Sequence, residues 1–171
     1  MENHFDLFHL PQQFAIDAGQ LDKAYREVQG RVHPDRFANA TDAEKRVAMQ
    51  WATRANEAYQ TLKNPYKRAR YLCELNGVDL QIESNTAMPG DFLMQQLEWR
   101  ESLADAKAIK DVTALEVLQE DVETARKQEV ERIGRLLDAK QFNDAGAGVR
   151  KLMFLEKFSI EISHHIDQLD G

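Results

Sequence analysis

The chain has 171 residues and a formal net charge of −7 at pH 7, from 22 Lys and Arg against 29 Asp and Glu. Its 43% hydrophobic and 30% charged residues are typical of a folded, soluble protein of one or two domains, and they exclude a disordered chain. Because it has a single cysteine, Cys73, and no run of about 18 apolar residues, the sequence also excludes an internal disulfide framework and predicts no membrane-spanning helix.

The first part of the chain predicts a short helix followed by a longer one. The N-terminus, residues 1–4, is acidic and polar where a targeting peptide is basic, so we expect the protein in the cytoplasm. The apolar stretch 5–10 predicts one or two helical turns that end before Pro11. Asp17 is an N-cap signal, and apolar residues then step by threes and fours as far as Val32. A helix from Asp17 to about Val32 is therefore expected.

Residues 33–64 predict a loop and an antiparallel partner helix. Pro34 ends the preceding helix, and residues 33–40 are expected to form a loop. Thr41 and Glu44 form a capping box that opens the next helix, which ends at Asn64-Pro65. This helix has a stripe of small, aromatic and aliphatic residues that would let a second helix approach closely. The stripe residues are Ala48, Trp51, Ala52, Ala55, Ala58, Tyr59 and Leu62.

The remainder of the chain predicts a short helix, a linker and three long helices. The short helix over 66–75 is closed by the C-cap signal Asn76-Gly77, and a linker with the polar centre Glu83-Ser84-Asn85-Thr86 follows. The long helices, the second opened by a capping box at Thr113 and Glu116, fold most simply as an antiparallel bundle. Their expected ranges are 91–109, 113–139 and 143–169. The sequence thus predicts an all-α protein with an N-terminal domain over residues 1–75, a linker over 76–90 and a three-helix bundle over 91–171.

The charge is unevenly divided along the chain. Residues 1–75 have a net charge of +1 and residues 76–171 a net charge of −8. Such asymmetry occurs in proteins whose halves bind different partners, but an acidic helical half is as often only a solvated surface. A nucleic acid is disfavoured as a partner of the acidic half, because phosphate binding requires an excess of Lys and Arg on one face. We expect neither a nucleic acid nor a membrane as a partner of the protein.

The tripeptide His33-Pro34-Asp35 lies in the predicted loop between the two antiparallel helices. Pro34 fixes its own backbone angle and biases His33 away from helix, so the flanking side chains project from a defined loop. The tripeptide alone is weak evidence, because a proline helix stop between two polar residues accounts for it as well. Its setting in a helical hairpin, after a short helix and before a second proline stop, makes it informative.

Residues 5 to about 75 resemble the J-domain of heat-shock co-chaperones, in which His-Pro-Asp separates the second and third helices. The resemblance includes Asp6-Leu7-Phe8 and residues 55–62, Ala-Asn-Glu-Ala-Tyr-Gln-Thr-Leu. It implies docking on an Hsp70-type chaperone, here HscA-like, and stimulation of its ATPase. Val32 stands where the family usually has an aromatic residue, which implies weaker or more partner-specific docking. The resemblance assigns chaperone binding to His33, Pro34, Asp35, Arg36, Lys23, Arg26 and Arg31.

The helix that begins at Asp91 has two apolar faces. At about 100° per residue, Phe92, Trp99, Leu103 and Ala106 fall within about 40° of one another and predict a core stripe. A second apolar face, bordered by charged residues, consists of Leu93, Met94 and Leu97.

In the last helix, Met153 and Phe154 likewise fall outside a core stripe. The stripe residues of that helix are Gly148, Leu152, Leu155, Phe158, Ile162, Ile166 and Leu169. The pattern leaves two interpretations open for the apolar residues outside the core stripes. Either they pack on another helix or on the first domain, or they form a patch that binds a partner.

Residues 92–101 and 149–157 resemble the client-binding bundle of the HscB family, the J-type co-chaperones of iron–sulfur cluster biogenesis. With the J-domain, this resemblance covers essentially the whole chain. It implies that the protein delivers an IscU-like iron–sulfur scaffold protein to a dedicated Hsp70-type chaperone and stimulates its ATPase. A J-protein for a different client, or a helical adaptor without chaperone activity, remains the alternative. The resemblance assigns scaffold binding to Leu93, Met94, Leu97, Phe154, Glu98, Arg100 and Glu101.

Neither a metal site nor an active site is predicted. His4 and His9 are five residues apart and His164-His165 are adjacent, so neither pair has the helical spacing of metal ligands. Cys73 lies in an apolar helix, where a buried and inert thiol is expected. We therefore expect no cofactor and no enzymatic activity of the chain itself.

Overall fold

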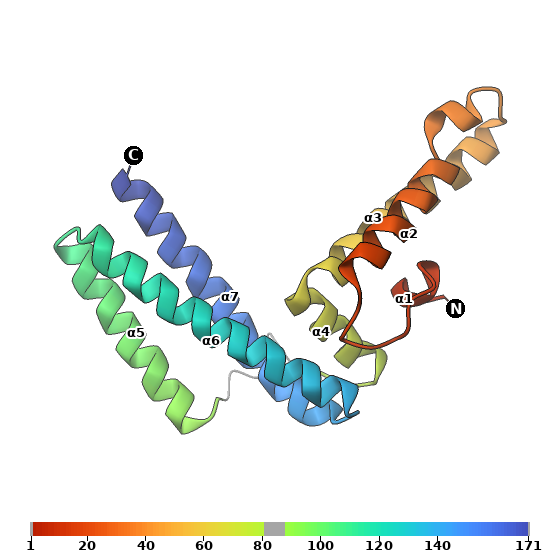
Figure 1. Ribbon diagram of the computed structural model, residues 1–171. Helices are drawn as coiled ribbons and strands as arrows, with labels where there is room; N and C mark the ends of the chain where they lie inside the picture. The colour runs from red at the N-terminus through yellow and green to blue at the C-terminus, as the bar shows by residue number, and fades with distance from the viewer. Residues whose placement is uncertain (1, 81–87, 171) are drawn as a thin grey trace.

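The computed structural model describes residues 2–80 and 88–170, and every regular element in these residues is a helix. The all-α prediction is confirmed. Two parts are visible in Figure 1: an arm formed by a helical hairpin, and a set of long antiparallel helices on the other side of the molecule. Within the described residues, no helix is long and apolar enough to cross a membrane.

The arm consists of α1 (His4–Leu7), α2 (Ala18–Arg31) and α3 (Asp42–Lys63). The predicted caps are confirmed, because Asp17 accepts from the Gly19 and Gln20 N–H groups and Thr41 accepts from the Glu44 N–H. A fully buried Phe5 joins α1 to the hairpin. The Asn64 side chain then caps α4 (Pro65–Leu75), with Pro65 in the first helical position, where its missing N–H costs nothing.

The predicted stripe of α3 is only partly buried. Ala48, Ala55, Ala58 and Leu62 are buried, as expected, and Tyr59 stacks on Tyr25 of α2 with 4.1 Å between ring centroids. Trp51 and Ala52 are exposed, so their assignment to the stripe is wrong. The Trp51 ring instead lies at the surface, with the Arg54 guanidinium 5.3 Å from its centroid.

The second part is built around a hairpin of two long helices, α6 (Val112–Asp138) and α7 (Phe142–Asp170). With 27 and 29 residues, each is about 40 Å long at a rise of about 1.5 Å per residue. At one end of this hairpin, α5 (Gly90–Ala108) completes the predicted three-helix bundle. At the other end, α4 packs against both α6 and α7 (Figure 1). The long hairpin thus belongs to the bundle and also supports the arm.

Two turns differ from the sequence-based prediction. Residues Pro34–Phe37 form a 3₁₀ helix, where a loop was expected, because Pro34 has a helical φ and the His33 side chain caps the turn. Helix α6 begins after Asp111, whose carboxylate accepts from the Ala114 N–H, so the predicted capping box at Thr113 is wrong. The sequence favoured Thr113 because Glu116 follows it by three residues, whereas Ala114, which has no polar side chain, follows Asp111 by three.

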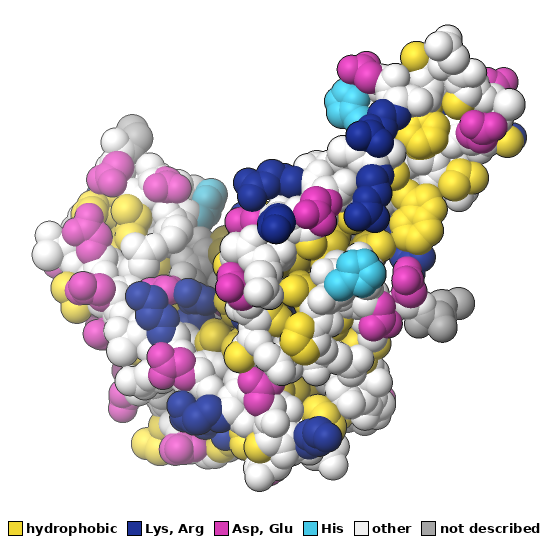
Figure 2. All heavy atoms as spheres, turned by 45° about the vertical axis from the view of Figure 1, so that its right-hand side comes forward, with side chains coloured by type: hydrophobic (Ala, Val, Ile, Leu, Met, Phe, Trp, Pro, Cys, Tyr) yellow, Lys and Arg dark blue, Asp and Glu magenta, His cyan; other side chains and the backbone are white. Residues whose placement is uncertain are grey.

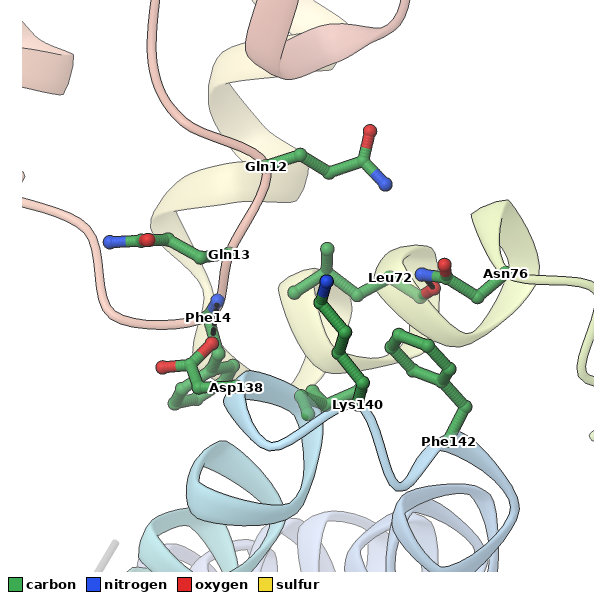
Figure 3. Close-up of a pocket in the computed structure, with 9 residues that line it drawn as sticks. Gln12, Gln13, Phe14, Leu72, Asn76, Asp138, Lys140 and Phe142 are labelled. Carbon is green, nitrogen blue, oxygen red and sulfur yellow. Dashed lines mark hydrogen bonds between the residues drawn. The ribbon is translucent and has the colours of Figure 1, made fainter.

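The two parts meet at a junction centred on Phe14. The Asp138 carboxylate at the end of α6 accepts from the backbone N–H of Phe14 at 2.8 Å (Figure 3) and from that of Ala15 at 3.3 Å. The Phe14 ring lies between the Arg68 guanidinium, 4.4 Å from its centroid, and Gly134 of α6. Figure 3 shows Lys140, from the α6–α7 turn, and Phe142, the first residue of α7, beside a pocket of about 410 Å³ at this junction.

The predicted linker also contributes to this contact. Val78 and Leu80 pack on Gly146 of α7, and Leu80 is 5% exposed. The Leu80 carbonyl accepts from Arg150 at 3.5 Å. The polar centre of the linker, residues 83–86, lies outside the described residues.

Replacing Gly134 by Ala is expected to strain the junction. A Cβ at this position would lie 2.5 Å from the Phe14 ring, which is closer than any normal contact. Gly30→Ala in α2 is the matched control, because a Cβ there meets nothing within 4 Å and both changes gain the same helix propensity. We expect Gly134→Ala to be less stable than Gly30→Ala by about 1–3 kcal/mol in urea unfolding. Equal stabilities would show that Phe14 does not pack against α6.

Candidate functional site

The His-Pro-Asp segment forms a preorganised turn at the far end of the arm. His33 is extended (φ −60°, ψ 136°) and its Nδ1 accepts from the Asp35 N–H at 3.2 Å, so the proton of the neutral ring lies on Nε2. The Arg36 N–H donates to the His33 carbonyl at 3.0 Å and closes the turn. We call residues 33–37 the tip turn. Its backbone geometry is fixed by local bonds before any partner arrives.

The polar side chains of the tip turn are open to solvent. The Asp35 side chain is 93% exposed, and its contact with the His33 ring is at 3.6 Å, longer than a hydrogen bond. A carboxylate in this position retains most of its hydrogen-bonding capacity for another molecule. Arg36, beside it, is also exposed.

The basic residues of α2 are exposed but do not form one row. At about 100° per residue, Lys23 lies about 60° from Arg26 around the helix, and Arg31 lies about 140° from Arg26. All three side chains are exposed. Figure 2 shows Lys and Arg side chains along the arm, with hydrophobic side chains beside them. The basic surface therefore wraps around α2 and faces in more than one direction.

The two faces of α5 are separated as the periodicity predicts. Phe92, Trp99, Leu103 and Ala106 are between 3% and 8% exposed and form the core stripe. On the other face, Leu93 is 44% exposed, and Met94 and Leu97 are each 65% exposed. We call these three residues the α5 patch. The sequence left open whether these residues pack against another part of the chain or form a patch that binds a partner. Their exposure excludes packing against the described part of the chain.

Phe154 and Arg100 form one border of the α5 patch. The half-buried Phe154 ring contacts Phe92 edge to face, with 5.7 Å between centroids, and stacks on Phe158 at 5.4 Å. Arg100 bridges from α5 to α7, where its Nη1 donates to Glu161 Oε2 at 2.7 Å and its guanidinium lies 4.7 Å from the Phe158 centroid. Phe154 is thus held in place by the core and exposes only part of its ring.

The other charged candidates lie farther around α5. Glu101 and Glu98 are exposed, at about 180° and 240° from Phe92 on the helical wheel. Glu98 therefore borders the α5 patch on the side away from Phe154. On the helical wheel Arg100 is next to Leu93 and Leu97, and Glu98 is next to Met94, so these two charged residues lie at opposite borders of the α5 patch.

Sequence reasoning missed Glu161, the residue that fixes Arg100. The two residues are 61 positions apart, and nothing in the local pattern of either helix relates them. Only the packing of α5 against α7 brings them into contact. Arg100 consequently has a structural role in addition to its predicted role in binding.

The single thiol is unsuited to nucleophilic chemistry. Cys73 is completely buried in α4, and this burial raises the pKa of its thiol to about 11. At neutral pH the group is therefore protonated and inaccessible. Among residues 2–80 and 88–170, no cluster of three or more His, Cys, Asp or Glu side chains is arranged to hold a metal ion.

In comparisons with known proteins, each of the two parts of the chain matches a family model. The model of the DnaJ domain family matches residues 3–71, and that of the HSCB C-terminal oligomerisation domain matches residues 88–163. A co-chaperone HscB homologue of Burkholderia multivorans is 55% identical over 169 residues, with 99% of this chain and 97% of the relative covered. A homologue of the same name from Paraburkholderia xenovorans is also 55% identical, over 170 residues and with the same coverage.

Solved structures with the same fold include the chaperone HscB from Vibrio cholerae, with a TM-score of 0.84 and 36% identity. This match covers 98% of the present chain and 99% of the other. The human co-chaperone HscB has a TM-score of 0.89 at 25% identity, with 95% and 81% of the two chains covered.

An exposed His-Pro-Asp turn between antiparallel helices, on a matching DnaJ domain, defines the chain as a J-domain protein. The full-length identity and the second domain narrow this class: the chain belongs to the HscB family of co-chaperones. It is a J-type co-chaperone of iron–sulfur cluster assembly. An Hsp70-type partner, whose ATPase it stimulates, and delivery of a scaffold protein to that partner follow from this membership.

Proposed function

We propose that the chaperone is HscA-like, that the delivered client is an IscU-like scaffold protein, and that the two bind at opposite ends of the molecule. The tip turn with Lys23, Arg26 and Arg31 binds the chaperone. The α5 patch with Phe154 binds the scaffold. The observation that carries this proposal is the position of the two exposed surfaces, one at the free end of the arm and one on the bundle (Figure 1).

The chemistry of the α5 patch supports a protein partner. Three large apolar side chains within five residues of one helix, all at least 44% exposed, are costly to leave in water. The acidic Glu98 and Glu101 form a polar rim, as at protein interfaces. Phe154 adds an aromatic side chain whose position is fixed in advance by Phe92 and Phe158, which lowers the entropy lost on binding.

We further propose the division into a J-domain over residues 1–75, a linker over 76–90 and a client-binding bundle over 91–171. The contacts of α4 with α6 and α7 support a fixed arrangement of the two domains. The bound scaffold is then held at a set distance from the tip turn, so that one chaperone molecule can receive it.

A co-chaperone acts through the ATPase of its partner, and we propose that this chain has no catalytic activity of its own. The purified chain without chaperone is then expected to hydrolyse no ATP. We propose the cytoplasm as its location, which is supported by its similarity to bacterial co-chaperones and by its one reduced, buried thiol.

The two-surface arrangement is tested by forming the ternary complex. The full chain is mixed with the scaffold and with the ATP-bound chaperone, separately and together, and the complexes are sized by sedimentation velocity. We expect a complex of three components that is larger than either binary one. Displacement of the scaffold by the chaperone would contradict separate surfaces, and a chain that binds neither would favour a helical adaptor with other partners.

Charge reversal on α2 is expected to weaken chaperone docking mainly through the association rate. In Lys23→Glu and Arg26→Glu an attractive exposed charge becomes repulsive, and such long-range effects are screened by salt. The association rate, measured by stopped flow, should fall by about tenfold at low salt and recover towards the wild-type value as the salt concentration rises. A defect that is independent of salt would indicate misfolding instead.

A further inference from the structure

A hollow of about 310 Å³ lies between α1, the C-terminal end of α2, and α3. Its lining is mainly apolar and also includes Arg31, His9 and Glu2. We call it the arm hollow, and its apolar walls are Leu7, Val28, Val32 and Trp51. A second depression shares Leu7, His9, Val28 and Arg31 with it and extends along α2 to Lys23 and Glu27.

Trp51 is held at the edge of the arm hollow by neighbouring groups. The Arg54 guanidinium lies over its ring, and Arg54 Nη2 donates to the Glu2 carbonyl at 2.8 Å. The indole is still 38% exposed. A large aromatic side chain that is fixed in position but incompletely covered is typical of an anchor residue at a protein interface.

The arm hollow is continuous with the surface assigned to the chaperone. Val32 is part of its wall, and the next residue, His33, begins the tip turn. Arg31 lines both depressions, and Lys23 lines the second one. A chaperone that contacts the tip turn, Lys23 and Arg31 is therefore next to the arm hollow.

We propose that the arm hollow receives an apolar side chain of the Hsp70-type chaperone and so contributes to the choice among chaperones. This inference rests on the proposed function, because it adds a contact to the same interface. A pocket of about 310 Å³ is at the lower end of the range for small-molecule sites, and its open, apolar walls suit a protein side chain better than a cofactor. Because the arm hollow is continuous with the tip turn, its occupant is expected to be the chaperone and not a second copy of the chain.

Trp51→Ser tests the arm hollow, and Met49→Ser is its control. Met49 lies two residues away on α3, is 69% exposed and does not line the hollow. Chaperone ATPase is titrated with each variant. For Trp51→Ser, we expect the concentration at half-maximal stimulation to rise by about tenfold or more while the maximum is unchanged. For Met49→Ser, both values should equal those of the wild type.

A second measurement does not depend on the folding of Trp51→Ser. The tryptophan emission of the wild type minus that of Trp51→Phe isolates Trp51 from Trp99 and from the chaperone. This difference spectrum should shift to the blue, and become less sensitive to acrylamide, when the ATP-bound chaperone is added. The same changes without chaperone, at high concentrations of the chain alone, would identify a second copy as the occupant and overturn the inference.

The outcomes separate this inference from the function on which it rests. If the wild-type chain does not stimulate the chaperone, the proposed function is wrong. If the wild type stimulates and Trp51→Ser has the half-maximal concentration of Met49→Ser, with no spectral shift, the chaperone does not use the arm hollow.

Discussion

Replacing Asp35 by Asn is expected to abolish stimulation of the chaperone ATPase. The Asp35 carboxylate is 93% exposed and has no short hydrogen bond to its neighbour His33, so its acceptors remain open to the chaperone. Charge-assisted hydrogen bonds are worth about 1.5–3 kcal/mol each, and the amide of Asn lacks the charge. The measurement is single-turnover ATP hydrolysis by the chaperone with increasing amounts of the variant.

The fold and the other surface should be unchanged by this substitution. Asp35 supports the tip turn through its backbone N–H, which donates to His33 and remains in the variant. Helicity and scaffold affinity should therefore equal those of the wild type. His33→Gln is expected to lose stimulation as well, because the group that caps the turn is altered. Normal stimulation by Asp35→Asn would refute the assignment of the tip turn to the chaperone.

Replacing Leu93, Met94 and Leu97 together by Ala is expected to lower scaffold affinity by well over tenfold. Truncating an interface anchor commonly costs about 2 kcal/mol or more, and every 1.4 kcal/mol is about tenfold in affinity. The melting temperature should fall little, because the three side chains are between 44% and 65% exposed in the free protein. Scaffold titration and thermal unfolding on the same variant measure the two effects.

Leu103→Ala is the matched control on the same helix. Leu103 is 4% exposed, so its truncation should cost about 2–5 kcal/mol of folding free energy without altering the α5 patch. The two variants should therefore show opposite patterns. Phe154→Ala should share the loss of affinity, with some loss of stability from its ring contacts. A triple variant that binds the scaffold normally would remove the α5 patch from the interface.

The parts of the fold that depend on neighbours along the chain could be predicted. Asp17 and Thr41 cap their helices through bonds to residues two or three positions away, and the sequence contains both partners. The separation of the α5 patch from the core stripe also followed from the helical period alone. In contrast, the start of α6 was misplaced because Thr113 has a capping-box partner, Glu116, and the true cap, Asp111, has none.

The features that the sequence could not predict join distant segments. Phe14 and Asp138 are 124 residues apart, and Arg100 and Glu161 are 61 apart. No local pattern relates either pair, so neither the junction nor the role of Arg100 as a bridge was expected. Trp51 was misassigned for a related reason, because its position on α3 suits the core stripe while its surroundings depend on Arg54 and the N-terminal segment.

The most direct test of the account is the steady-state ATPase rate of the chaperone with this chain alone, with the scaffold alone, and with both. Because the tip turn and the α5 patch lie on different parts of one molecule whose two domains contact each other, we predict that the chain alone raises the rate. With both, the rate should exceed the sum of the separate increases. A rate that this chain leaves unchanged, or that the scaffold cannot raise further in its presence, would contradict delivery of the scaffold to the chaperone.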